Sequence, residues 1–178
     1  MQTRSENGME GAASVVRAVA AVSAPVDMHA SGRAIGRGFN RLVYTRMFLR
    51  SMKPRALAKL AQYPGLFDRA ALEAARDLYE FDNVFTAPLH GFKSANDYWT
   101  RASAKPQLQR IRIPTLLANA RNDPFVPAQS LPNDSEVSAS VTLWQPAHGG
   151  HVGFPAGGFP GHLHTLPEQV GGWLSLHL

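Results

Sequence analysis

The sequence predicts an α/β fold built on a parallel sheet. Three short apolar runs, at residues 14–25, 113–124 and 140–146, have the length and composition of buried strands, and each closes in a proline or a polar turn. Between the first two runs, residues 31–108 have the composition of helices. Strands that alternate with helices are typical of α/β proteins with a parallel sheet.

Length and composition agree with one globular domain. The chain has 178 residues, of which 44% are hydrophobic and 17% charged, so it can bury a core. It contains no cysteine, which excludes disulfides, a thiol nucleophile and thiolate metal sites. No apolar run approaches the roughly 18 residues of a membrane-spanning helix. We therefore expect a soluble, cytoplasmic protein that uses no cofactor.

The first element after a polar, frayed N-terminus at residues 1–13 is the run "SVVRAVAAVSAP", a strand closed by Pro25. The next is a basic helix. Eight Lys and Arg residues and no acid lie between Met28 and Phe67, within a chain of net charge +5. Basic residues recur at helical spacing beside an apolar stripe; the two sets are Arg33, Arg37, Arg41, Arg46 and Arg50, and Ile35, Phe39, Leu42, Val43 and Met47.

Two interpretations of this basic helix stay open. It lies on an anionic membrane or an acidic partner, or it is a surface helix whose solvated face is rich in arginine. A nucleic-acid partner is not expected, because neither zinc-ligand spacing nor the signature of an RNA-binding sheet accompanies it.

The later elements follow in order. Asp68 suits the N-cap of a helix over "RAALEAARDLYEF", and residues 81–103 are aromatic and rich in turns. The strands at 113–124 and 140–146 come next. The chain closes with a helix from residue 166, where Pro167 suits the first turn.

Polar turns follow the last two predicted strands, where the chemistry of parallel sheets is found. The first is "NDP" with Asp123, and the second is "HGGH" with His148 and His151. A carboxylate followed by a histidine supplies the orienting acid and the base of a nucleophilic triad, in the chain order of α/β-hydrolases. Glycines let the histidine loop turn sharply. Two alternatives are a turn-forming Asp123 and a metal site; the latter would use His148, His151, His162 and His164.

Three stretches, "FDNVFTAPLHGFKSANDYW", "IPTLLANARNDPFVP" and "HGGHVGF", resemble the YheT-like branch of the α/β-hydrolases, family 4 of the AB hydrolase superfamily. The resemblance covers residues 14–178 and implies an esterase or lipase that acts on acyl esters. It implies that Asp123 is the triad acid and His151 the base, with His148 a loop residue. It also implies a helical cap at residues 31–108, in which the role of His90 is undefined.

The nucleophile elbow of that family, G-x-S-x-G, does not occur in these 178 residues. The chain thus resembles the C-terminal part of a serine carboxylesterase or lipase, with acid and base but no nucleophile, and we expect it to be inactive by itself. The partner would be an acyl ester, once an N-terminal part completes the site. The alternative function is a non-catalytic module whose basic cap helix contacts a lipid surface or a protein. Self-association through an exposed sheet edge is also expected.

Overall fold

The computed structural model describes residues 14–177, so the expected fraying of residues 1–13 lies outside the described residues. The chain divides into two compact units. One comprises the segments up to Val26 and from Ala104, and carries the sheet. The other, Asp27–Ser103, is helical. That the helical unit serves as a cap stays a prediction.

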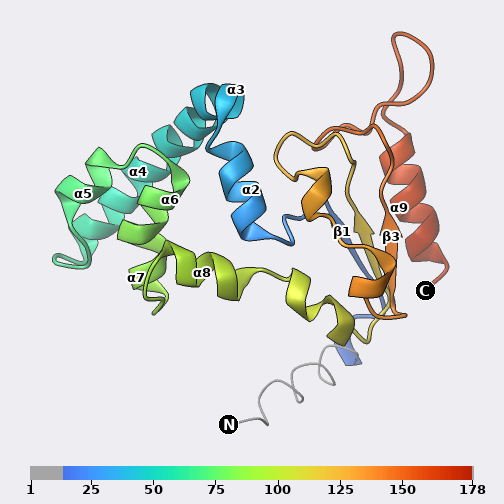
Figure 1. Ribbon diagram of the computed structural model, residues 1–178, viewed down its shortest axis with the longest axis horizontal. Helices are drawn as coiled ribbons and strands as arrows, with labels where there is room; N and C mark the ends of the chain where they lie inside the picture. The colour runs from blue at the N-terminus through green and yellow to red at the C-terminus, as the bar shows by residue number, and fades with distance from the viewer. Residues whose placement is uncertain (1–13, 178) are drawn as a thin grey trace. The chain divides into compact units, whose positions relative to one another are not determined.

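The sheet unit contains three parallel strands in the order β1 (Val19–Val22), β2 (Thr115–Ala118) and β3 (Val141–Trp144) (Figure 1). The prediction of an α/β fold with a parallel sheet is confirmed. All four residues of the central strand β2 are buried, as its continuous apolar run requires. The strands also stay in register, since Val19, Thr115 and Val141 lie side by side at their amino ends.

Side chains pack against both faces of the sheet. Leu108, Leu117 and Val141 form its buried cluster. Helix α9 (Thr165–Ser175) runs beside the sheet (Figure 1), and Trp173 Nε1 donates a hydrogen bond of 3.3 Å to Thr142 Oγ1 of β3. Short 3₁₀ turns complete the unit at Lys105–Arg110, Ala128–Ser130 and Asp134–Glu136.

The helical unit has its own core, made by Leu49, Ala56, Leu72, Ala75 and Phe81. Its elements are α2 (Met28–Ile35), α3 (Gly38–Asn40), a π-helical stretch (Arg41–Thr45), α4 (Arg46–Gln62), α5 (Arg69–Ala74), α6 (Leu78–Phe81), a second π-helical stretch (Asp82–Thr86), α7 (Ala87–Leu89) and α8 (Ala95–Ala102). Trp99 Nε1 and Thr86 Oγ1 donate hydrogen bonds to the Asp82 carboxylate, at 2.8 and 2.5 Å. Burial raises the pKa of Asp82, and these two bonds oppose that rise.

The predicted N-cap of Asp68 is confirmed, because its carboxylate accepts a hydrogen bond of 3.0 Å from the Ala71 amide. The prediction of a single basic helix is wrong. It divides after Ile35, and the chain restarts at Gly38, whose φ of +52° lies in the left-handed region that favours glycine. The helix predicted after Asp68 is likewise interrupted at Ala75.

The outer edge of β1 pairs with no strand of residues 14–177. An uncovered apolar edge offers unpaired backbone groups to another chain, and Val22 on β1 is 37% exposed. We expect the 178-residue chain to self-associate. Light scattering across a concentration series should give an apparent mass that rises with concentration, and Val19→Lys on the same strand should lower it. A constant monomer mass would contradict this prediction.

Candidate active site

The loops that follow the three strands meet at the carboxyl edge of the sheet. Ser23 follows β1 directly, Asp123 lies five residues after β2, and His151 lies seven residues after β3. Parallel strands place their carboxyl ends at one edge, so three sequence segments far apart in the chain supply side chains to one place. Asp123 and His151, the two residues that the sequence singled out, are in direct contact there.

Asp123 Oδ2 lies 2.8 Å from His151 Nδ1. The Asp123 side chain is fully buried, whereas that of His151 is 34% exposed. The other carboxylate oxygen, Oδ1, accepts hydrogen bonds from the amides of Phe125 and Val126, at 2.8 and 3.2 Å. The buried carboxylate is therefore held by three N–H donors, which stabilise its charge and fix its direction.

The contact with Asp123 sets the tautomer of His151. A carboxylate only accepts hydrogen bonds, so Nδ1 carries the proton and Nε2 keeps its lone pair. No hydrogen bond joins Nε2 to another residue within 14–177. The ring of Phe125 lies edge-on to the imidazole, with centroids 4.8 Å apart, and restricts its rotation. The imidazole is thus oriented by an acid on one side and open on the other.

Gly149 and Gly150, in the histidine loop (residues 146–154, which carries His151), have different structural roles. Gly150 has φ +62°, a conformation that residues with a Cβ rarely adopt. At Gly149 an added Cβ would lie 2.7 Å from both the Ala120 side chain and the Phe154 ring, so the loop packs there without room for a methyl group. Glycine at both positions therefore lets the loop follow this path without backbone strain at Gly150 or a clash at Gly149.

Asn122 is a residue of this site that sequence reasoning missed. Its Oδ1 accepts hydrogen bonds of 2.9 Å from the amides of both Gly149 and Gly150. It therefore ties the loop after β2 to the loop that carries His151. Its position next to Asp123 was the only signal in the sequence, because an asparagine before an aspartate in a turn has an ordinary local explanation.

Asn122→Ala should release this loop. The change removes the acceptor of two amides, one of them in the buried residue Gly149, and an unpaired buried amide costs about 1–3 kcal/mol. We expect the free energy of unfolding in urea to fall by that amount and the downfield NMR resonance of the His151 Nδ1 proton to broaden. Asn122→Asp, which keeps the acceptor, should retain the resonance. A sharp resonance in the alanine variant would contradict a positioning role.

Ser23 lies at the same edge. It is 6% exposed with φ +52°, and its hydroxyl donates a hydrogen bond to the backbone carbonyl of His151, not to the imidazole. Its proton is thus committed to the loop backbone. Ser23 supports the histidine loop and does not have the geometry of a nucleophile activated by the ring.

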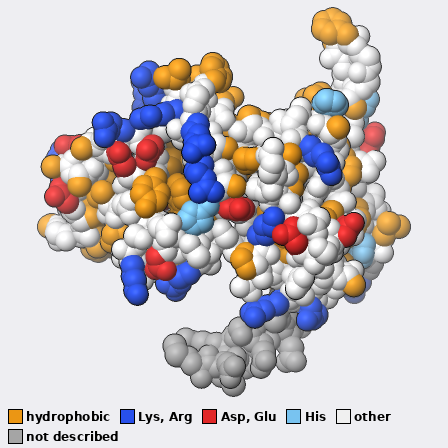
Figure 2. All heavy atoms as spheres, viewed as in Figure 1, with side chains coloured by type: hydrophobic (Ala, Val, Ile, Leu, Met, Phe, Trp, Pro, Cys, Tyr) orange, Lys and Arg blue, Asp and Glu red, His pale blue; other side chains and the backbone are white. Residues whose placement is uncertain are grey.

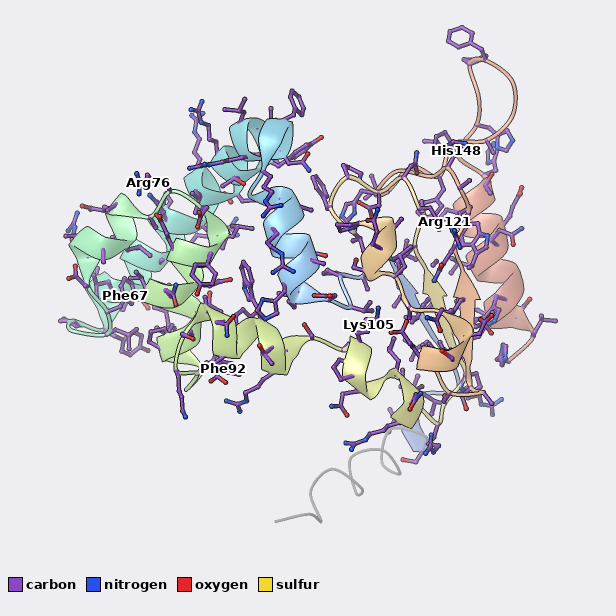
Figure 3. The ribbon with its side chains drawn as sticks, viewed as in Figure 1. Phe67, Arg76, Phe92, Lys105, Arg121 and His148 are labelled. Carbon is purple, nitrogen blue, oxygen red and sulfur yellow. The ribbon has the colours of Figure 1, made fainter. Side chains whose placement is uncertain are left out.

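The other histidines are elsewhere. His148, labelled in Figure 3, is exposed and makes no contact with Asp123. His162 and His164 stack on each other, with centroids 5.5 Å apart, and His90 is exposed at the end of α7. Within the described part of the chain, no three side chains of His, Asp or Glu gather as a metal would need.

No helix among residues 14–177 has the length and hydropathy to cross a membrane.

Comparison with known proteins adds to this geometry. A family model described as "alpha/beta hydrolase fold" matches residues 16–157. The chain is 38% identical to "Putative esterase YheT" of Escherichia coli (strain K12), over 92% of this chain and 48% of that protein. No solved structure gives a significant match.

Two other relatives are named as lipid hydrolases. "Phospholipase ABHD3" of Mus musculus is 28% identical over 86% of this chain and 38% of its own length. "Monoacylglycerol lipase" of Saccharomyces cerevisiae (strain ATCC 204508 / S288c) is 30% identical over 83% of this chain and 34% of its own length. The chain therefore spans about half, or less, of the length of these curated relatives.

Proposed function

Since the chain belongs to the α/β hydrolase fold family, we propose that it supplies the acid and the base of an ester-hydrolysing triad, Asp123 and His151. The observation that carries the proposal is the 2.8 Å contact between a buried carboxylate and an imidazole whose Nε2 is uncommitted, at the carboxyl edge of a parallel sheet. The names of relatives, an esterase, a phospholipase and a monoacylglycerol lipase, support an acyl ester as substrate.

In the proposed reaction, His151 Nε2 takes the proton of a hydroxyl group as the hydroxyl oxygen attacks the ester carbonyl carbon. Asp123 stays ionised and stabilises the imidazolium that forms. The imidazolium then gives its proton to the departing alkoxide, which leaves as an alcohol. In the second half, His151 takes a proton from water, the water oxygen attacks the acyl carbon, and the nucleophile regains its proton as the acid is released.

We propose that the nucleophile comes from sequence outside these 178 residues. None of the serines of the chain has glycine two positions before and two positions after it. Ser23, at the carboxyl edge of the sheet, donates its proton to the backbone carbonyl of His151. The covalent step also needs aimed N–H donors for the oxyanion, and we assign none within this chain.

The test has two parts. The isolated chain should hydrolyse a short-chain chromogenic ester no faster than its His151→Ala variant. Co-expression with a segment from a YheT-like relative that carries G-x-S-x-G should yield turnover. That turnover should disappear in His151→Ala and persist in His148→Ala, which changes an exposed histidine of the same loop.

Two results would contradict the proposal. Turnover by the isolated chain that is lost in His151→Ala would mean that the chain holds its own nucleophile, and Ser23→Ala would then test the hydroxyl that contacts the backbone of His151. Turnover of the complemented protein that survives in His151→Ala would remove the base from the proposal.

A further inference from the structure

Four large apolar side chains lie on the surface of the helical unit where the sequence predicted an apolar stripe. Phe39 is 71% exposed, Leu42 59%, Met47 53% and Val43 41%. The buried side of the same helical segment is made instead by Thr45 and Leu49, with Thr45 Oγ1 bonded to the Ile35 carbonyl at 2.9 Å. We call the four exposed residues the apolar ridge. Clustered exposed apolar residues mark a binding surface more often than scattered ones do.

A basic hollow of about 710 Å³ lies beside this ridge, also within the helical unit. Five of its eight lining residues are cationic, none is acidic, and the full set is Arg41, Leu42, Arg46, Leu49, Arg50, Lys53, Pro54 and Arg76. Leu42 belongs to both the ridge and the hollow. Figure 2 shows Lys and Arg side chains next to hydrophobic ones over the end of this unit where α3 lies in Figure 1, and Figure 3 labels Arg76.

Most of the positive charge of the hollow is not paired with an acidic side chain. Arg41, Arg46 and Arg50 form no ion pair with residues 14–177. Lys53 Nζ donates to the backbone carbonyl of Glu73 at 2.7 Å, which leaves its charge in place. Arg76 forms an exposed ion pair with Glu80, at 3.6 Å. Phosphate and carboxylate groups are the ligands that such a surface favours.

We propose that this surface docks on an anionic phospholipid bilayer, with headgroup phosphates at the arginines of the hollow and the apolar ridge at the acyl boundary. Guanidinium groups bind phosphate oxygens bidentately, and exposed Phe and Leu beside basic residues are the composition of interfacial segments. A soluble phosphate would account for the hollow but not for the ridge. A second copy of the chain, equally basic, would account for the ridge but not for the hollow.

This inference goes beyond the proposed ester hydrolysis, because it concerns where the protein binds and is read out without turnover. The full chain is mixed with one of two kinds of vesicle, made either of phosphatidylcholine alone or of phosphatidylcholine with one third phosphatidylglycerol. The vesicles are then floated in a density gradient and the bound protein is measured. We expect partition into the anionic vesicles only. Arg46→Gln/Arg50→Gln should lower the partition coefficient roughly twenty-five-fold, at about a fivefold loss for each basic residue.

The matched control is Arg110→Gln/Arg112→Gln, which removes the same charge from exposed positions outside the helical unit. It should lower the partition less than threefold. Phe39→Ser should lower it about tenfold, and Phe159→Ser, at a position 104% exposed in the sheet unit, should change it little. Circular dichroism establishes that each variant is folded.

Three results would overturn the proposal. Equal losses in the two arginine doubles would mean attraction by net charge alone. Equal losses in the two phenylalanine variants, or none, would remove the ridge from the contact. Self-association without vesicles that is lost in Phe39→Ser would assign the ridge to a second copy of the chain.

Discussion

Asp123→Asn should abolish nearly all turnover of the protein completed with a G-x-S-x-G segment. An asparagine at this position can present its amide N–H₂ to His151 Nδ1, which turns Nδ1 into an acceptor and moves the ring proton to Nε2, where the base must be free. In a serine protease the same change at the triad acid lowers kcat about 10⁴-fold. We expect a loss of that order in kcat, because the imidazole would stay in place in the wrong tautomer.

The control is Asp134→Asn, which makes the same replacement at an exposed aspartate of the sheet unit, in the 3₁₀ turn Asp134–Glu136. Its kcat should match that of the unmodified protein. Single-turnover kinetics separate the chemical step from product release. A loss below about tenfold in Asp123→Asn, with the fold intact, would mean that Asp123 serves the turn through its bonds to Phe125 and Val126 and does not orient the base.

Phe154→Ala should cost the sheet unit about 3–5 kcal/mol of unfolding free energy. Phe154 is 2% exposed, stacks on Trp144 of β3 with ring centroids 5.2 Å apart, and packs against Gly149. Its amide also donates to the Gly149 carbonyl at 2.8 Å, although its φ of +43° is unusual for a residue with a side chain. Removing the ring leaves a cavity beside Gly149 and Trp144.

Urea unfolding followed by tryptophan fluorescence measures this loss. Phe159→Ala makes the same replacement five residues further along the chain, at a side chain that is 104% exposed, and should change the unfolding free energy by less than about 0.5 kcal/mol. A comparable loss in both variants would contradict the assignment of Phe154 to the core of the sheet unit.

Local patterns account for much of what was predicted correctly. Each strand lies inside a predicted run, because short apolar runs closed by prolines or polar turns are readable without knowledge of distant contacts. The cap at Asp68 is equally local, since its carboxylate binds an amide three residues on. Asp123 and the pair His148 and His151 could be placed at one edge because parallel strands end there, a rule that needs only the order of the elements. The choice of His151 over His148 came from the resemblance to the YheT-like branch of the α/β-hydrolases.

The helical segment shows where such patterns fail. Spacing alone predicted one basic helix, yet Gly36 and Gly38 allow the chain to leave helical geometry between α2 and α3. Periodicity places Phe39, Leu42 and Met47 on a common face but does not say whether that face is covered. The structure buries Thr45 and Leu49 instead, since these side chains meet neighbours from other parts of the unit.

By itself, the sequence determined the fold class, the order of the three strands along the chain and the polar turns that hold Asp123, His148 and His151, because these depend on composition and local order. Only the tertiary structure decided that Asn122 joins Asp123's loop to the glycines, that the Ser23 hydroxyl supports the His151 backbone, and that the apolar ridge stays on the surface. The physical reason is distance along the chain. Ser23 and His151 are separated by 128 residues, and hydrogen bonds and burial between such segments arise only when the whole chain is folded.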